Sequence, residues 1–206
     1  MPLRLAPDTH LAQIEQDFIV LDLHSDAYLC WIAENEATET GAFAAALVEA
    51  GLATGKPNDR LPEQEARRRE WQDLPRVPPA VDFAALWRFA FALCQSIWFA
   101  AGRPLGKVFT GLRSGHWPPD RAQPDLAIAV ATFDSIASWL PWSPECRFRS
   151  LLLRQYLGCD LDWIVGVRLY PFRAHCWLAA GTIVVGDSVH RVIGYEPITI
   201  FSPGRR

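Results

Sequence analysis

Three residues in the last third of the sequence, Cys146, His175 and Asp187, have the types and the order that nucleophilic acyl chemistry requires. A cysteine thiol becomes a strong nucleophile when a base takes its proton, and imidazole titrates near neutral pH. A carboxylate on the second ring nitrogen fixes the imidazole tautomer. We therefore predict a triad with Cys146 as nucleophile, His175 as base and Asp187 as the group that orients the histidine.

The element that carries Cys146 is predicted to be a helix. Ser143 suits the N-cap and Pro144 the first helical position, and Gly158 stands where a C-terminal glycine stop belongs. Cys146 would then lie in the first turn, where free backbone N–H groups and the helix dipole lower a thiol pKa. Its own N–H could help to bind a tetrahedral oxyanion.

The histidine and the aspartate are expected on a β-hairpin after a strand over residues 161–168. Residues 173–179 and 182–185 form the hairpin, with His175 on its first strand and Asp187 after its second. A three-residue loop at residues 180–182 would place His175 opposite Asp187, and a loop one residue earlier would leave them diagonal on one face. A two-residue loop at residues 180–181 would put them on opposite faces and break the triad.

A zinc site is the alternative use of the thiols, with Cys146, Cys159, His175 and Cys176 as ligands. Their spacing matches no common zinc finger, and adjacent strand residues point to opposite faces. We therefore predict no metal ion.

The chain divides into two parts around residues 57–80, which hold five prolines and ten charged residues and are typical of a linker. In residues 1–56, β-rich runs at 17–23 and 26–32 flank a polar break, after a short strand near 3–5. A helix follows from Thr40 to Gly51. This part is small and has no titratable cluster, so we expect a binding module.

The second part, residues 81–206, opens with an apolar helix over residues 82–101, and a further helix is expected over 126–140. Nineteen nearly apolar residues would suit a membrane span. Its polar residues Arg88, Gln95 and Ser96 share one narrow stripe, which favours a helix that is buried or faces a partner. We do not expect a membrane protein.

Composition excludes other classes of function. The chain has 206 residues, half of them hydrophobic, and a formal net charge of −3, with no basic run beyond residues 67–69, so nucleic-acid binding is not expected. Five cysteines occur without a CxxC pair, and no secretory signal is evident near the start. We expect a cytoplasmic protein with reduced thiols.

Residues 146–198 closely resemble the transglutaminase-like peptidase of lasso-peptide biosynthesis. The matching elements are Cys146-x-x-Arg149-Ser150, Gly166-Val167, Pro171-Phe172-x-Ala174-His175-x-Trp177, Gly181, Asp187 and Tyr195-x-Pro197-Ile198. The resemblance implies the same triad roles in a cysteine peptidase that removes the leader from a ribosomally made precursor peptide.

Residues 18–29, FIVLDLHSDAYL, are similar to the winged-helix-like recognition module that is fused to this peptidase in many lasso clusters. In that family the leader adds as a strand to the third strand of the module. Here that strand would be residues 26–32, with Tyr28, Leu29, Cys30 and Trp31 as leader-binding residues. The expected fold is α+β: a recognition module at 1–56, a linker at 57–80 and a papain/transglutaminase-like peptidase domain at 81–206.

The resemblance also implies a partner, an ATP-using cyclase that closes the macrolactam ring, and a leader cleavage that depends on ATP. The sequence has no GxxxxGK[ST] phosphate loop, so no cofactor is evident in this chain.

Two other functions stay open. A transglutaminase or acyltransferase would use the same triad with an amine as acceptor in place of water. A non-catalytic scaffold would only deliver peptide to another enzyme, although the presence of Cys146 with His175 argues against it.

Overall fold

The computed structural model of the protein describes residues 3–33, 39–55, 70–100, 103, 106–108, 123–158 and 161–202, which form an α+β structure. The strands are β1 (Arg4–Leu5), β2 (Thr9–Ile14), β3 (Asp17–Asp22), β4 (Ala27–Trp31), β5 (Ala53–Thr54), β6 (Gln72–Asp73), β7 (Asp162–Arg168), β8 (Arg173–Ala180), β9 (Ile183–Val185) and β10 (Glu196–Phe201). The helices are α1 (Glu39–Glu49), α2 (Phe83–Ala100), α4 (Gln123–Ala137), α5 (Cys146–Leu157) and α6 (Val189–Val192).

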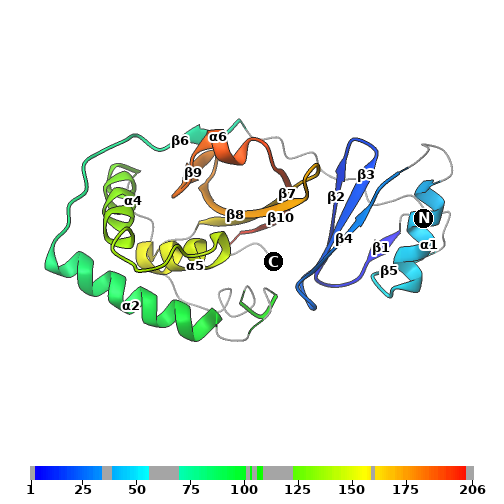
Figure 1. The fold of residues 1–206 in the computed structure, drawn as a ribbon, viewed down its shortest axis with the longest axis horizontal. Helices are drawn as coiled ribbons and strands as arrows, with labels where there is room; N and C mark the ends of the chain where they lie inside the picture. The colour runs from blue at the N-terminus through cyan, green and yellow to red at the C-terminus, as the bar shows by residue number, and fades with distance from the viewer. Residues whose placement is uncertain are drawn as a thin grey trace.

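The N-terminal part is an antiparallel sheet in the order β2-β3-β4, with α1 packed on one face (Figure 1). Phe18 and Val20 of β3 point to this face and form a buried cluster with Phe43 and Leu47 of α1. The sequence predicted the strands at 3–5, 17–23 and 26–32 and the helix. It did not predict β2, because the run THLAQI mixes polar and apolar residues without clear alternation.

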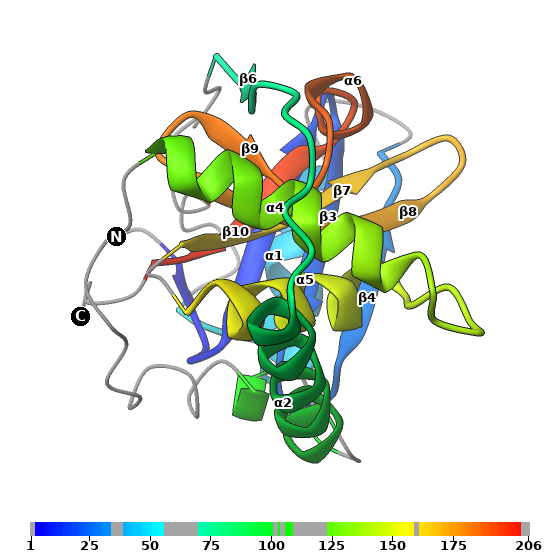
Figure 2. The same ribbon diagram turned by 90° about the vertical axis from the view of Figure 1, so that its left-hand side faces the viewer.

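The C-terminal part is built on a five-stranded sheet in the order β10-β7-β8-β9-β6, in which only the β6–β9 pair is parallel. Helices α2, α4 and α5 lie together on one face of this sheet, as Figure 2 shows from the side of the helices. Trp71 and α6 pack on the opposite face around the buried Trp177. Helix α5 contacts β8 directly, so it carries Cys146 to the strand that carries His175.

One buried cluster contains side chains from both parts of the chain. Ile19 and Leu21 of β3 belong to the same cluster as Phe133 of α4, Tyr156 of α5 and Leu178 of β8. The N-terminal sheet is therefore apolar on both faces, which explains the nearly continuous apolar run of β3. Strand β2 also lies beside β10.

The second half of the expected linker belongs to the fold around the five-stranded sheet. Gln72 and Asp73 pair with β9, and the ring of Trp71 lies 6.0 Å from that of Trp177. Strand β6 has only two residues, which is too short to show the alternation of apolar and polar residues that predicts a strand. The sequence therefore could not predict it. Residues 56–69 lie outside the described residues, and the domain boundary within 57–80 stays a prediction.

Helix α2 agrees with the predicted helix to within a residue at each end. The Asp82 carboxylate accepts a hydrogen bond from the Ala85 N–H at 2.7 Å and caps its start. Helix α4 begins and ends three residues earlier than expected. In the described part of the chain, α2 alone is long and apolar enough to cross a membrane, and 22% of it is buried.

Candidate active site

Cys146 is the first residue of α5, and this position follows from the backbone at Glu145. Glu145 is the N-cap, with φ −58° and ψ 153°, and its side chain makes no capping hydrogen bond. The expected N-cap at Ser143 is therefore wrong by two residues, because Ser143 and Pro144 precede the turn that starts the helix. Gly158 ends the helix in the left-handed conformation, as predicted.

His175 and Asp187 meet through a short hydrogen bond. Nε2 of His175 lies 2.6 Å from Oδ2 of Asp187, and only 13% and 10% of these two side chains are exposed. Since Nε2 faces the carboxylate, Nδ1 is the nitrogen available to the thiol of Cys146. The carboxylate thus fixes the tautomer, as a triad requires.

The hairpin makes this contact with a register that differs from all three considered from the sequence. Ala180 pairs with Ile183, so the loop is the two-residue turn at residues 181–182 rather than the three residues 180–182. Continued pairing would put Asp187 opposite Cys176, on the wrong face for His175. However, strand β9 ends at Val185, so this pairing does not continue. Gly186 has φ 73° and changes the direction of the backbone, and the Asp187 side chain therefore reaches His175.

Gly186 also allows close packing against α5. A Cβ atom at this position would overlap the side chain of Leu153. Arg149 holds the same turn, since its Nη1 donates a hydrogen bond to the Gly186 carbonyl at 2.6 Å and its Nη2 pairs with Asp134 at 2.7 Å. Arg149 therefore links the helix of the nucleophile to the loop that carries Asp187.

Ser150, the next residue of the same motif, links α5 to the strand of the histidine. Its hydroxyl donates a hydrogen bond to the Cys176 carbonyl at 3.1 Å. Sequence reasoning found Arg149 and Ser150 only as elements of a resemblance, without a role. Their hydrogen bonds give both a positioning role.

The rings of Trp177 and Tyr195 surround His175, with centroid distances of 6.1 and 5.3 Å. Gly166 makes room for both rings, because a Cβ atom there would come within 2.6 Å of Trp177 and 2.9 Å of Tyr195. The aromatic cover shields the His175–Asp187 pair from water and strengthens it.

The electrostatics favour a thiolate at Cys146. A hydrogen bond with the thiol of Cys176 is the largest influence on the pKa of Cys146. That hydrogen bond lowers the pKa, whereas burial raises it. A further hydrogen bond with His175 lowers it again, so the pKa of Cys146 falls to about 4. Burial lowers the pKa of His175, but its bonds with Asp187 and Cys146 raise it overall to about 9. Near neutral pH the two residues form a thiolate–imidazolium pair.

Cys176 is a site residue whose role the sequence did not predict. The hydrogen bond with Cys146 and complete burial raise the pKa of Cys176, so it remains a thiol that donates to the thiolate. The position of Cys176 directly after His175 was the signal in the sequence that could have indicated this role.

Cys159, one of the four ligands of the alternative zinc site, lies outside the described residues. No group of three or more His, Cys, Asp and Glu among the residues with described positions could hold a metal ion.

The four candidate leader-binding residues, Tyr28, Leu29, Cys30 and Trp31, all lie on β4. Within the described chain β4 pairs only with β3, so its other edge is open. Leu29 is 49% exposed, and Trp31 packs against Phe43 of α1 with ring centroids 5.7 Å apart. Side chains at alternate positions along this strand therefore point to α1.

The start of β4 lies beside the nucleophile. Arg147, the residue after Cys146, pairs with Asp26 at 2.7 Å. The ring of Tyr28 lies 5.5 Å from that of Phe172, and burial, together with the negative charge of Asp26, raises the pKa of Tyr28. The sequence gave no sign of these contacts, which join segments more than a hundred residues apart.

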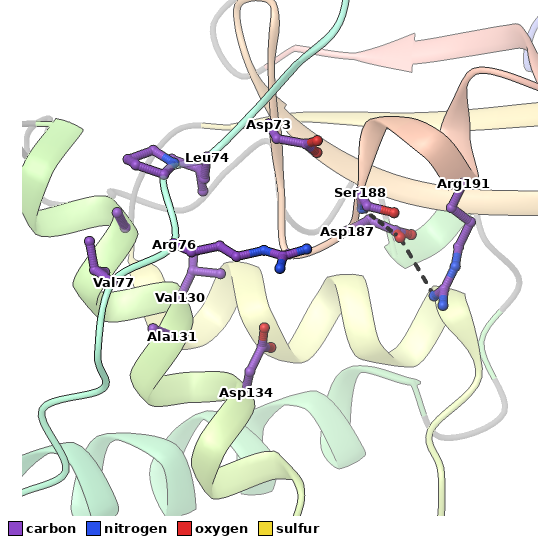
Figure 3. A pocket seen from close by; sticks show the side chains of 13 residues that line it. Asp73, Leu74, Arg76, Val77, Val130, Ala131, Asp134, Asp187, Ser188 and Arg191 are labelled. Carbon is purple, nitrogen blue, oxygen red and sulfur yellow. Dashed lines mark hydrogen bonds and ion pairs between the residues drawn. The ribbon is translucent and has the colours of Figure 1, made fainter.

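A pocket of about 540 Å³ opens beside Asp187, between α4, the extended segment after β6 and the start of α6. Figure 3 shows Arg76 reaching into it, with the carboxylates of Asp73 and Asp134 on either side. Asp187 and Arg191, paired at 3.5 Å, complete its charged lining. Three carboxylates and two guanidinium groups therefore give the lining a formal net charge of −1.

Comparison with known proteins identifies one family. A model of the transglutaminase-like superfamily matches residues 89–199, a range that contains Cys146, His175 and Asp187. Members of this superfamily are commonly cysteine peptidases or acyltransferases. No curated protein and no solved structure matches the chain significantly.

Proposed function

The chain belongs to the transglutaminase-like superfamily, and we propose that it is a cysteine peptidase that binds the leader of a lasso precursor peptide and cleaves it off. The precursor is made on the ribosome, and the cleavage precedes ring closure by a partner cyclase. The observation that carries the proposal is the open edge of β4 beside the nucleophile. The Arg147–Asp26 pair joins the turn before β4 to the helix that begins at Cys146.

In the first half of the reaction, the Cys146 thiolate attacks the carbonyl carbon of the scissile peptide bond. The oxyanion forms at the N-terminus of α5, where backbone N–H groups have no partner within the helix. The His175 imidazolium gives its proton to the leaving amine, and a thioester remains on Cys146. Neutral His175 then takes a proton from water, whose oxygen attacks the thioester and releases the leader as a carboxylic acid.

In the proposal the N-terminal part is a winged-helix-like recognition module at residues 1–56. The leader adds to the free edge of β4 through main-chain hydrogen bonds, and its side chains contact Leu29 and Trp31. Leader binding holds the scissile bond at the site and converts a weak encounter into an effectively intramolecular one. The reaction takes place in the cytoplasm, where thiols stay reduced.

The proposed partner is the ATP-using cyclase that closes the macrolactam ring. ATP would act on that enzyme, since the sequence of this chain has no GxxxxGK[ST] phosphate loop. Adding ATP to this chain alone should leave the rate of cleavage unchanged, and adding the cyclase with ATP should raise it. A rate increase by ATP on the isolated chain would contradict this assignment.

The module assignment is tested with Leu29→Asp in the full-length protein. A charge at the open edge should raise KM for a leader-bearing peptide and leave kcat nearly unchanged, because Leu29 lies on β4 and is none of the three catalytic residues. Ile128→Asp is the matched control, since Ile128 is an exposed apolar residue on α4. Equal KM values for the two variants would contradict leader binding at β4.

An acyltransferase is the second candidate, because the superfamily contains both activities. The thioester on Cys146 would then react with an amine in place of water. Reaction in the presence of a primary alkylamine separates the two functions: a peptidase releases the free acid, and an acyltransferase releases the amide.

A further inference from the structure

The outer face of α2 is apolar along its whole length. Phe83, Trp87, Phe91, Ile97 and Trp98 are between 51% and 74% exposed, and Figure 1 shows α2 at the outer edge of the molecule. Contiguous exposed apolar surface of this kind marks an interaction site.

The inner face of α2 already has its partners. Ala85, Phe89, Ala92 and Ser96 are buried at spacings of four, three and four residues, and the helix packs on α5 and α4. The exposed residues lie on the opposite side of the same helix. They are Phe83, Ala84, Trp87, Ala90, Phe91, Cys94, Ile97 and Trp98.

We propose that this outer face of α2 binds the same face of a second copy of the chain, as an antiparallel helix pair about a twofold axis. The axis passes between Ala90 and Phe91. A twofold interface uses one surface patch on both subunits, so the patch must be complementary to itself.

The residue sizes meet this requirement. With the axis between residues 90 and 91, Trp87 faces Cys94, Phe91 faces Ala90, and Ile97 faces Ala84 of the other copy. Each of these pairs joins a large side chain to a smaller one, which lets two helices interdigitate.

At the two ends of this helix pair, Phe83 faces Trp98 of the other copy. The guanidinium of Arg103 covers one face of the Trp98 ring at 4.8 Å, so Phe83 can pair with the edge of that ring. The eight exposed positions are thus symmetric about the centre of the helix.

Charge and area also suit a second copy. Arg88 is the one charged residue in the sequence of α2, and its guanidinium lies over the ring of Tyr156 at 5.2 Å, away from the exposed face. No like charges therefore oppose one another at the axis. A whole aromatic side chain buries roughly 150–250 Å². Because the four aromatic side chains of this face are between 64% and 74% exposed, they and Ile97 offer on the order of 600 Å² per copy. Two copies reach about 1,200 Å², the lower end of the range for specific interfaces.

A membrane surface fits this helix less well. Helices that lie on a bilayer are typically rich in Lys and Arg on the face opposite the apolar one. The opposite face of α2 is Ala85, Phe89 and Ala92, buried against the rest of the protein.

The test is the mass of the full-length protein in solution, measured by analytical ultracentrifugation at micromolar concentration. The wild type should sediment at twice its chain mass of 23.1 kDa. Trp87→Glu should sediment as a monomer with an unchanged circular dichroism spectrum. Trp139→Glu is the matched control, because Trp139 is also 65% exposed but lies outside α2, and this variant should stay dimeric.

A cross-link tests the predicted pairing itself. Trp87→Cys should form a covalent dimer on mild oxidation through the native Cys94 of the second copy, and adding Cys94→Ala should abolish it. A monomeric wild type, a dimer that persists in Trp87→Glu, or co-flotation of the wild type with lipid vesicles would each overturn the proposal.

Discussion

Cys146 and His175 have pKa values on either side of neutrality, and the pH dependence of the reaction should follow them. Below about pH 4 the Cys146 thiolate becomes protonated, and above about pH 9 His175 loses the proton that the leaving amine needs. We expect kcat/KM to be bell-shaped with limbs near these two values. The profile is measured with a leader-bearing peptide, and an acid limb near the ordinary thiol pKa would contradict the ion pair.

Cys176 should set the position of the acid limb through its hydrogen bond to the thiolate. Cys176→Ala removes the donor and leaves the nucleophile in place, so the variant should remain active with its acid limb shifted upward. Cys176→Ser keeps a donor and should restore much of the shift. The rate of iodoacetamide alkylation of Cys146 against pH reports the same pKa without substrate. Identical profiles for the alanine variant and the wild type would show that Cys176 only fills space.

Asp187 should matter for the rate much more than for substrate binding. Asp187→Asn keeps the shape but favours the wrong tautomer of His175, so we expect kcat to fall by roughly 10³–10⁴-fold. KM should change little. Steady-state kinetics measures both constants, and a wild-type kcat would mean that Asp187 is only a turn residue.

At the scale of the elements, the turn at Gly186 decides whether the triad forms. Gly186→Ala forces a side chain into the left-handed region and against Leu153, which should lower the free energy of unfolding by about 2–4 kcal/mol and impair catalysis. Gly181→Ala is the control, since Gly181 has φ 64° and open space around it. Urea denaturation of both variants isolates the cost of the overlap, and equal losses would contradict this role of Gly186.

Periodicity and stop signals predicted α1, α2, α4 and α5 and the strands β3, β4, β7, β8 and β9, but neither β2 nor β10. The helix that carries Cys146 and its end at Gly158 followed from the apolar face and a terminal glycine. The position of Asp187 could not be derived, because the hairpin register predicts the wrong face. A single positive-φ glycine after β9 reverses that outcome, and its conformation depends on contacts with α5.

At the scale of the whole molecule, the sequence predicted two parts joined by a linker, and the structure adds how they pack. Ile19 and Leu21 belong to the buried cluster that also contains residues of the C-terminal helices and strands, and the Tyr170 hydroxyl donates a hydrogen bond to Asp17 at 2.6 Å. Apolar runs show that residues are buried but not against which element, so these contacts could not be predicted. Separated fragments would expose this shared surface, and tests of function therefore need the full-length chain.

The most direct test of the central claim is a mass spectrum of a leader-bearing lasso precursor peptide after incubation with this protein. The proposal predicts two products, a leader with a free C-terminal carboxylate and an intact core peptide, which together gain one water. Cys146→Ala should bind the precursor and leave it uncut. An uncut precursor with the wild-type protein, or equal cleavage by Cys146→Ala, would contradict the account.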